Sequence, residues 1–190
     1  MSKTDDMEYL PIRMIRRDLA DLPQHTLPEG YSLRAFAPGD RETWLRLWRA
    51  AETFQTIHDE MFDNDFADDL PGMARRCLFL VSPAGEDIGT ATAWYERRYL
   101  GRAWGRVHWV CIVPAEQGKG LSRGLMTATM NLLRALGHRR AVLATQTPRI
   151  AAIRTYLHFG FVPDLADPGA THAWRLVARH IDHPALKALV

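Results

Sequence analysis

The feature that most constrains the fold is an apolar run that ends at a proline and leads through a glycine-bearing turn into an amphipathic helix. Residues 107–114 have the composition of a strand, and the turn 115–120 follows them. Apolar residues then recur at helical spacing over 121–136, and Gly137 is a stop signal. Because such a junction leaves N–H groups unpaired at the positive end of a helix dipole, we expect a cradle for phosphate groups here.

The residue types in the turn suit that interpretation. Gly118 and Gly120 carry no Cβ, so the backbone can adopt unusual angles and approach a ligand closely. Ser122 adds a small hydroxyl at the start of the helix, and Lys119 and Arg123 add positive charge.

Two familiar phosphate-binding loops do not fit the turn. A Walker loop has lysine and then serine or threonine directly after its second glycine, whereas Leu121 and Ser122 follow Gly120. A dinucleotide fingerprint needs three glycines at another spacing and an acidic residue about twenty positions later. Residues 141–144, near that distance, are apolar, so both loops are excluded.

Two segments resemble the signatures of one family. The hexapeptide Gln-Gly-Lys-Gly-Leu-Ser at 117–122 resembles the acetyl-CoA-binding motif Gln/Arg-x-x-Gly-x-Gly/Ala of the GCN5-related N-acetyltransferase (GNAT) superfamily, with Ser122 at the third small position. The segment 152–163, with Tyr156 and the pair Gly160-Phe161, resembles the family's tyrosine-bearing helix closed by Gly-Phe. The resemblance covers about 31–179 and is sharp over 107–163.

The fold class expected is α/β (α+β). The order of strand and helix patterns favours a mixed sheet with helices on both faces. The resemblance implies a GNAT-like, mostly antiparallel sheet of six to seven strands with a V-shaped split at the central strand. The expected domain organisation is an N-terminal arm over 1–30, an acetyltransferase domain over 31–180 and a C-terminal tail over 181–190.

Periodicity and turn signals place the individual elements. Strands are expected at 31–36, 77–82, 88–96, 106–113, 141–145, 160–164 and 172–179, with a short edge strand at 12–16. Helices are expected at 41–54 with Asp40 as N-cap, at 59–69, at 121–136 and at 149–159.

By the resemblance, the chain is an acetyl-CoA-dependent N-acetyltransferase that transfers acetyl to a primary amine by direct attack on the thioester. The resemblance assigns cofactor binding to Ile112, Val113, Gln117, Gly118, Lys119, Gly120, Leu121, Ser122, Arg123 and Arg149. Among these, Ile112 and Val113 would carry the backbone N–H that stabilises the carbonyl oxygen. Arg149 either contacts a CoA phosphate or caps its helix, and both interpretations stay open.

Tyr156 is the candidate general acid. A phenol pKa of about 10 exceeds that of a thiol, about 8.5, so protonating the departing thiolate is uphill by only ~2 kcal/mol. In the family this tyrosine points at the sulfur of CoA. The alternative is a tyrosine packed at the sheet edge with its hydroxyl merely hydrogen-bonded.

The general base is less defined. Many family members carry a glutamate eleven residues before the first loop residue, where this chain has Arg106, which cannot act as a base at neutral pH. His108 lies on the same strand face, and Glu96 ends the neighbouring strand; these two are the candidates. A packed histidine without a proton-transfer role, or a chain of waters, are the alternatives.

The acceptor side of the site has two weaker signals. The acidic stretch 58–69 contains carboxylates that could attract a cationic amine, although a solvated helix face explains them too: Asp59, Glu60, Asp63 and Asp65. Four aromatic side chains could wall the pocket or belong to the core: Trp94, Tyr95, Tyr99 and Trp104.

Composition restricts the remaining function classes. The chain of 190 residues suits one domain, and its net charge of +2 without a clustered basic surface argues against nucleic acid. It has no apolar run of transmembrane length and no signal-peptide core, so we expect a cytoplasmic protein without a membrane partner. Cys77 and Cys111 are expected as buried free thiols, and no histidine pair has the spacing of metal ligands, so no metal is expected.

The expected partner is therefore a small-molecule or peptide amine, with a homodimer left open. The competing interpretation is a non-catalytic acyl-CoA-binding or regulatory module with the same fold, because the usual glutamate is missing. Binding of the cofactor without turnover on a broad amine panel would favour that module.

Overall fold

The computed structural model describes residues 7–189, which divide into two compact units. One unit comprises Gln24–Tyr95 and Arg106–Gly137, and is called the loop unit below because it carries the glycine-bearing turn. The other comprises the residues up to Pro23, Glu96–Gly105 and the residues from His138 onwards, and is called the tyrosine unit because it carries Tyr156.

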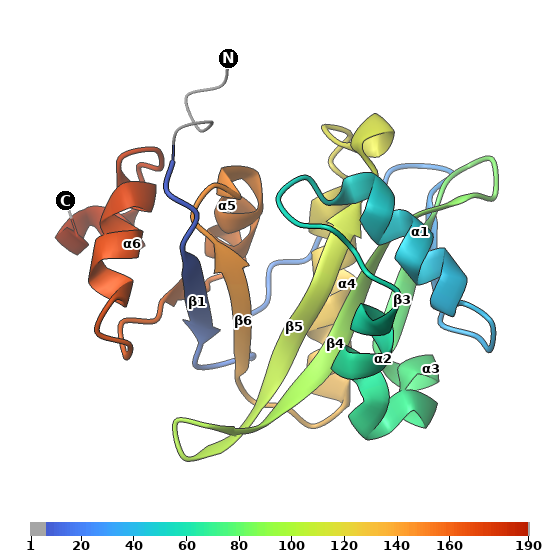
Figure 1. Ribbon diagram of the computed structural model, residues 1–190, viewed down its shortest axis with the longest axis horizontal. Coiled ribbons are helices and arrows are strands. Elements are labelled where there is room, and N and C mark those ends of the chain that lie inside the picture. Colours follow the sequence, from blue (N-terminus) through green and yellow to red (C-terminus); the bar gives the residue numbers. More distant parts are fainter. Residues whose placement is uncertain (1–6, 190) are drawn as a thin grey trace. The chain divides into compact units, whose positions relative to one another are not determined.

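Within the loop unit the strands follow the order β2-β3-β4-β5, and within the tyrosine unit they follow the order β6-β1-β7 (Figure 1). The pairs β2/β3, β3/β4, β1/β6 and β1/β7 are antiparallel, so the mixed α/β class with a mostly antiparallel sheet is confirmed. The V-shaped split and the domain boundaries stay predictions.

The loop unit holds the first helices and the middle of the sheet. Its helical segments before the sheet are α1 (Arg41–Ala51), α2 (Glu60–Phe66), the 3-10 helix η1 (Ala67–Gly72) and α3 (Met73–Arg76). Its strands are β2 (Ser32–Ala35), β3 (Cys77–Val81) and most of β4 (Asp87–Tyr99) and β5 (Arg102–Ile112). The 3-10 turn η2 (Pro114–Glu116) and α4 (Leu121–Ala135) complete the unit.

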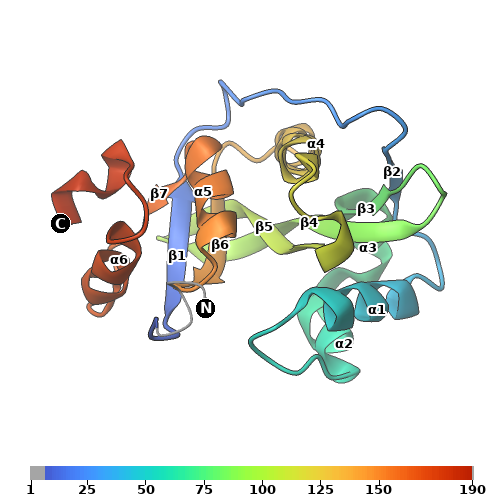
Figure 2. The same ribbon diagram turned by 90° about the horizontal axis from the view of Figure 1, so that it is seen from above.

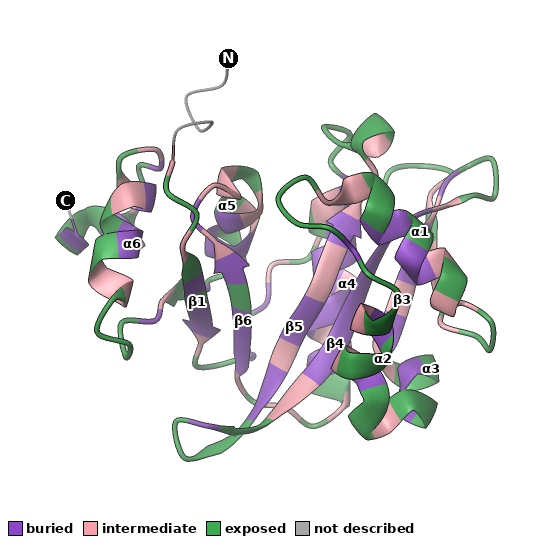
Figure 3. Ribbon diagram, in the orientation of Figure 1, coloured by how far each residue is buried: buried purple, intermediate pink, exposed green. Residues whose placement is uncertain are grey.

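Helices cover both faces of this part of the sheet, as expected. In Figure 2, α4 lies on one side of β4 and β5, and α1 and α2 lie on the other. Successive strand residues point to opposite faces. Phe79 and Cys111 accordingly pack with the tryptophans and phenylalanines of α1 and α2, whereas Leu80 and Ile112 pack with Leu121 of α4. Figure 3 shows the buried middle of β4 that results.

The tyrosine unit holds the remaining elements. These are β1 (Pro11–Arg16), β6 (Ala141–Gln146), α5 (Ile150–His158), β7 (Val162–Pro163), α6 (Ala170–Ala178) and the 3-10 helix η3 (Pro184–Leu189). The β4–β5 hairpin turns within this unit at Leu100 and Gly101, both with positive φ (48° and 78°), a requirement of tight hairpin turns of right-handed twist.

One expected strand and the position of another are wrong in this unit. Residues 172–178 belong to helix α6, because Ala173, Trp174 and Val177 bury one helical face. The strand within the N-terminal arm is not an edge strand, since β1 pairs with β6 on one side and β7 on the other.

The expected N-cap of α1 is only half right. Asp40 occupies the N-cap position, but its side chain makes no capping hydrogen bond. Its carboxylate instead pairs with Arg34 (Nη1–Oδ2 2.6 Å) and accepts the Ala37 N–H at 2.7 Å. Arg34 also pairs with Asp87 at 2.6 Å, so one guanidinium joins β2, the start of α1 and β4.

Candidate active site

The glycine-bearing turn between β5 and α4 has the backbone that its sequence predicts. Gly118 and Gly120 have φ of 79° and 78°, in the left-handed region that favours glycine. Gly120 is the N-cap of α4, and no side chain caps that helix. A Cβ built on either glycine would meet nothing within 4 Å. The space beside the turn is therefore open.

The N–H groups of the turn are available to a ligand. The backbone N–H groups of residues 118–123 form no hydrogen bond with any residue from 7 to 189. Residues 117–120 are exposed, so other side chains do not seal the turn. Several unpaired donors at the positive end of a 15-residue helix can bind an anion.

The turn is anchored to the strands on its other side. Gln117 Nε2 donates to the Ile112 carbonyl at 2.9 Å, which closes the turn on the end of β5. The Val113 N–H donates to the Ile88 carbonyl of β4 at 2.8 Å. The Val113 N–H is therefore already used in the sheet, which favours Ile112 as the donor to a carbonyl oxygen; the roles of both residues stay predictions.

The two cations of the turn differ in their surroundings. Lys119 Nζ pairs with Glu116 Oε1 at 2.9 Å, and the Tyr31 hydroxyl donates to Glu116 Oε2 at 2.8 Å. The hydrogen bond to Glu116 raises the pKa of Lys119, and the same bond lowers the pKa of Glu116. Arg123, by contrast, is exposed and makes no ion pair with the described residues.

His108 is buried at the middle of β5. Its Nε2 lies 3.3 Å from Oδ1 of Asp65, and its ring lies 5.6 Å from the ring of Phe66. Burial lowers the pKa of His108 to about 4, against the opposing effect of Asp65. His108 is thus neutral at pH 7 but a weak proton acceptor, which favours the alternative of a packed histidine.

Tyr156, Glu96 and Arg149 lie in the tyrosine unit. Tyr156 lies on the buried face of α5, with its ring 6.3 Å from that of Phe161. Arg149 is the N-cap residue of α5, and its guanidinium hydrogen-bonds the side chain of Gln146. Glu96 is half-buried in β4. The catalytic roles of Tyr156 and Glu96 and the cofactor contact of Arg149 stay predictions.

The aromatic candidates mostly belong to the core. The Tyr99 hydroxyl donates to the carboxylate of Asp164, and Trp104 is buried against the Tyr99 ring. In the loop unit, Trp94 is buried and stacks on the half-buried Tyr95 with centroids 4.8 Å apart. Arg76 lies over both rings, 5.7 Å and 4.9 Å from their centroids.

Two structural features of the loop unit were not predicted from the sequence. The contact between Asp65 and His108 joins α2 to β5, and only the helical spacing of Phe62, Asp65 and Phe66 hints at it. Trp109, next to His108, has φ of 49°, a left-handed conformation that is strained for a bulky residue. No local sequence signal marks this conformation.

Other candidate features lie apart from these residues. Cys77 and Cys111 are buried free thiols, as expected. Within residues 7–189, no group of three or more His, Cys, Asp or Glu side chains could hold a metal ion. Over the same residues, none of the helices has both the length and the apolar character needed to cross a bilayer.

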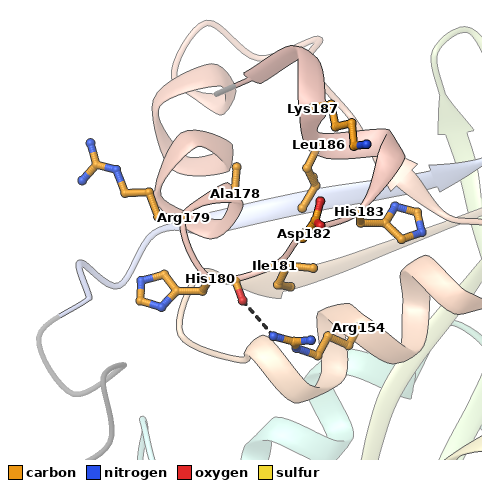
Figure 4. A pocket seen from close by; sticks show the side chains of 9 residues that line it. All are labelled: Arg154, Ala178, Arg179, His180, Ile181, Asp182, His183, Leu186 and Lys187. Carbon is orange, nitrogen blue, oxygen red and sulfur yellow. Dashed lines mark hydrogen bonds between the residues drawn. The ribbon is translucent and has the colours of Figure 1, made fainter.

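The tyrosine unit also contains a cavity of about 570 Å³. Figure 4 shows it between Arg154 of α5 and residues 178–187, with Arg154 Nη2 donating to the His180 carbonyl at 2.8 Å. It contains none of the site residues that the sequence predicts.

Comparison with known proteins identifies the relatives of this chain. The model of the acetyltransferase (GNAT) family matches residues 41–161. Proteins named mycothiol acetyltransferase from Nocardia farcinica and Streptomyces coelicolor are 34% and 32% identical, over 80% and 84% of this chain. The matches cover 53% and 52% of those proteins, so the chain spans about half the length of the curated relatives it matches.

Solved structures agree on the fold. A GCN5-related N-acetyltransferase from Sphaerobacter thermophilus aligns with a TM-score of 0.63 and 21% identity, over 82% of this chain and 50% of that one. A GNAT-family acetyltransferase from Colwellia psychrerythraea aligns with a TM-score of 0.62 and 9% identity, over 83% and 54%.

Proposed function

Because the chain belongs to the acetyltransferase (GNAT) family, we propose that it is an acetyl-CoA-dependent N-acetyltransferase acting on a primary amine of a small molecule or peptide. The observation that carries this proposal is the exposed turn 117–120, with two left-handed glycines, open space beside them and the unpaired N–H groups of residues 118–123. These features suit a diphosphate, which takes several donors and tolerates no side chain at the turn.

The residues of this chain would divide the work as follows. Acetyl-CoA supplies the activated acetyl group as a thioester. The N–H groups of 118–123 and the guanidinium of Arg123 bind its phosphates, and the Ile112 N–H is the remaining donor for the carbonyl oxygen. Tyr156 holds the proton that the departing thiolate needs. The amine must lose its proton before it attacks, and Glu96 or water is the remaining acceptor, since His108 is a weak base.

A second candidate is a non-catalytic acyl-CoA-binding module. Two observations favour it: Arg106 stands where many family members have glutamate, and burial lowers the pKa of His108 to about 4. Both residues are therefore poor general bases, which leaves Glu96 as the remaining candidate. Cofactor binding alone therefore does not separate the two candidates.

The test combines binding and turnover. Calorimetry measures the affinity for CoA, and release of the CoA thiol is followed with acetyl-CoA and a panel of amines that includes the acceptor of mycothiol acetyltransferases. For the enzyme, we expect turnover with at least one amine, and a fall in kcat of about 100-fold or more in Tyr156→Phe without loss of CoA affinity. Tight CoA binding without turnover on any amine would favour the binding module.

A further inference from the structure

The acidic segment 59–69 presents its carboxylates in two different environments. Three of its six carboxylates are compensated by arginine. Ion pairs with arginine involve Asp59 with Arg49, Asp63 with Arg41 at 2.8 Å, and Asp69 with Arg76 at 3.3 Å. These pairs leave little net negative charge on that side of the segment, so the solvated-face interpretation holds for them.

Asp65 faces the sheet instead. It shares a face of α2 with the buried Phe62, and its carboxylate lies 3.3 Å from His108 of β5. Within residues 7–189, no lysine or arginine forms an ion pair with it. Its side chain is 33% exposed, so part of it is open to solvent.

The groups around Asp65 preserve its negative charge. Burial raises the pKa of Asp65, but His108, Trp109 and the positive charge of Arg106 together outweigh burial and hold the pKa below its ordinary value. His108 is neutral because its own pKa is lowered to about 4. The buried Nε2 of His108 also lacks a hydrogen-bond partner with good geometry among the described residues.

Aromatic rings pack around the histidine that contacts this carboxylate. Phe66 and Trp109 lie 5.6 Å and 5.8 Å from the His108 ring, and Trp109 packs edge-on against Trp44 and Trp48 at 5.0 Å and 4.6 Å. Trp109 has a left-handed backbone and is half-buried. A partly buried carboxylate beside such a cluster, where the dielectric constant is low, attracts a cation more strongly than a solvated one does.

We propose that the exposed part of Asp65, backed by His108 and Trp109, binds the ammonium group of the acceptor substrate. This inference rests on the proposed function. It assigns amine binding to one carboxylate of the acidic segment. It also implies that the acceptor is a cation with an apolar body. Asp65 is a binding residue here; it holds the amine in its charged form before the amine loses its proton. The three neighbours paired with arginine contribute nothing specific.

Binding gives a test that does not depend on turnover. Methylammonium, 2-phenylethylammonium and glycinamide are titrated into the protein loaded with CoA, and 2-phenylethanol serves as the uncharged analogue. Calorimetry gives the affinity, and the indole N–H signal of Trp109 reports the location by NMR. We expect at least one amine to bind and shift that signal, and the alcohol to bind about 10-fold or more weakly.

Matched variants identify the carboxylate. Asp65→Asn keeps the shape of the side chain and removes its charge, and Asp63→Asn removes a charge two positions earlier in α2 that is paired with Arg41. We expect Asp65→Asn to weaken amine binding and raise the KM for the amine about 10-fold or more, with kcat and CoA affinity nearly unchanged. Asp63→Asn should leave all four quantities unchanged, and Asp65→Glu should restore part of the binding.

The outcomes separate this inference from the proposed function. Equal amine affinity in wild type and Asp65→Asn, equal binding of the alcohol, or no binding of any of the three amines would overturn the inference. Amine binding that depends on Asp65 without turnover on any amine would support the inference and overturn the enzymatic assignment. Retained CoA affinity in Asp65→Asn shows that the variant is folded.

Discussion

Leu27 lies so close to Gly124 that a Cβ on the glycine would be 2.6 Å from Leu27 Cδ2 and 3.2 Å from Leu27 Cα. Segment 24–31 lies alongside helix α4 here. The His25 N–H donates to Thr127 Oγ1 at 3.1 Å, and the amides of Gln24 and Asn131 hydrogen-bond each other. The segment therefore packs directly on the helix that carries the glycine-bearing turn.

Gly124→Ala should destabilise the protein, because the added methyl group meets the backbone of Leu27 as well as its side chain. We expect a loss of about 1–3 kcal/mol in the free energy of unfolding. Denaturant titration measures it. Leu27→Ala in the same chain should recover part of the loss, and equal stability of Gly124→Ala and wild type would contradict the contact.

Gly120→Leu should abolish most of the affinity for CoA, because its side chain would enter the open space beside the turn. The matched control is Gly85→Leu, since Gly85 has φ of 81° and equally open surroundings in the turn before β4. Both variants place a side chain at a positive φ, which costs about 1–2 kcal/mol of stability. Calorimetry should show a loss of about 10-fold or more in CoA affinity for Gly120→Leu alone; equal losses in both variants would rule out the cradle.

Glu116→Gln should tighten CoA binding, because the carboxylate pairs with Lys119 and repels phosphate. We expect an increase in affinity of about threefold to tenfold at low salt and a smaller one at high salt. Calorimetry at two salt concentrations checks this, with the exposed Glu86→Gln as control. Weaker binding would mean that Glu116 acts mainly by ordering the turn through Tyr31.

Arg34→Met should change how stability depends on pH. The hydrogen bond from Arg34 lowers the pKa of Asp40 in the folded protein, so this carboxylate stabilises the fold above its unfolded pKa. That contribution is lost as the pH falls, over about pH 5 to pH 3. Arg34→Met should lower stability at pH 7 by about 1–3 kcal/mol and flatten this part of the curve. Urea titrations at several pH values measure both effects, and an unchanged slope would contradict the pairing.

The elements predicted correctly are those specified by neighbouring residues. The strand, turn and helix around residues 107–136 carry their own periodicity and glycines, and the structure has β5 and α4 there. The interior place of β1 depends on pairing with β6 and β7, which local patterns do not encode. The segment 172–179 has an apolar pattern that fits either period, and tertiary packing of Trp174 selects the helix.

In the candidate site, too, the features specified by neighbouring residues were predicted and those that depend on tertiary contacts were not. The glycines of the turn follow from local backbone requirements, and both have the positive φ expected. The proximity of Asp65 to His108 arises because α2 packs on β5, and the environment of Val113 arises from its partner in β4. Such tertiary contacts determine the pKa of His108 and the hydrogen-bond partner of each N–H group. These properties could therefore be read only from the structure.

The strained tryptophan of β5 has a consequence for redesign. Glycine adopts φ of 49° at no steric cost, whereas Trp109 adopts it only because the surrounding rings hold the indole in place. Trimming Trp44 or Trp48 would remove that support and let the backbone relax toward a regular strand. Since side chains alternate across a sheet, such a change would turn His108 away from Asp65, and redesign at these tryptophans would break that contact.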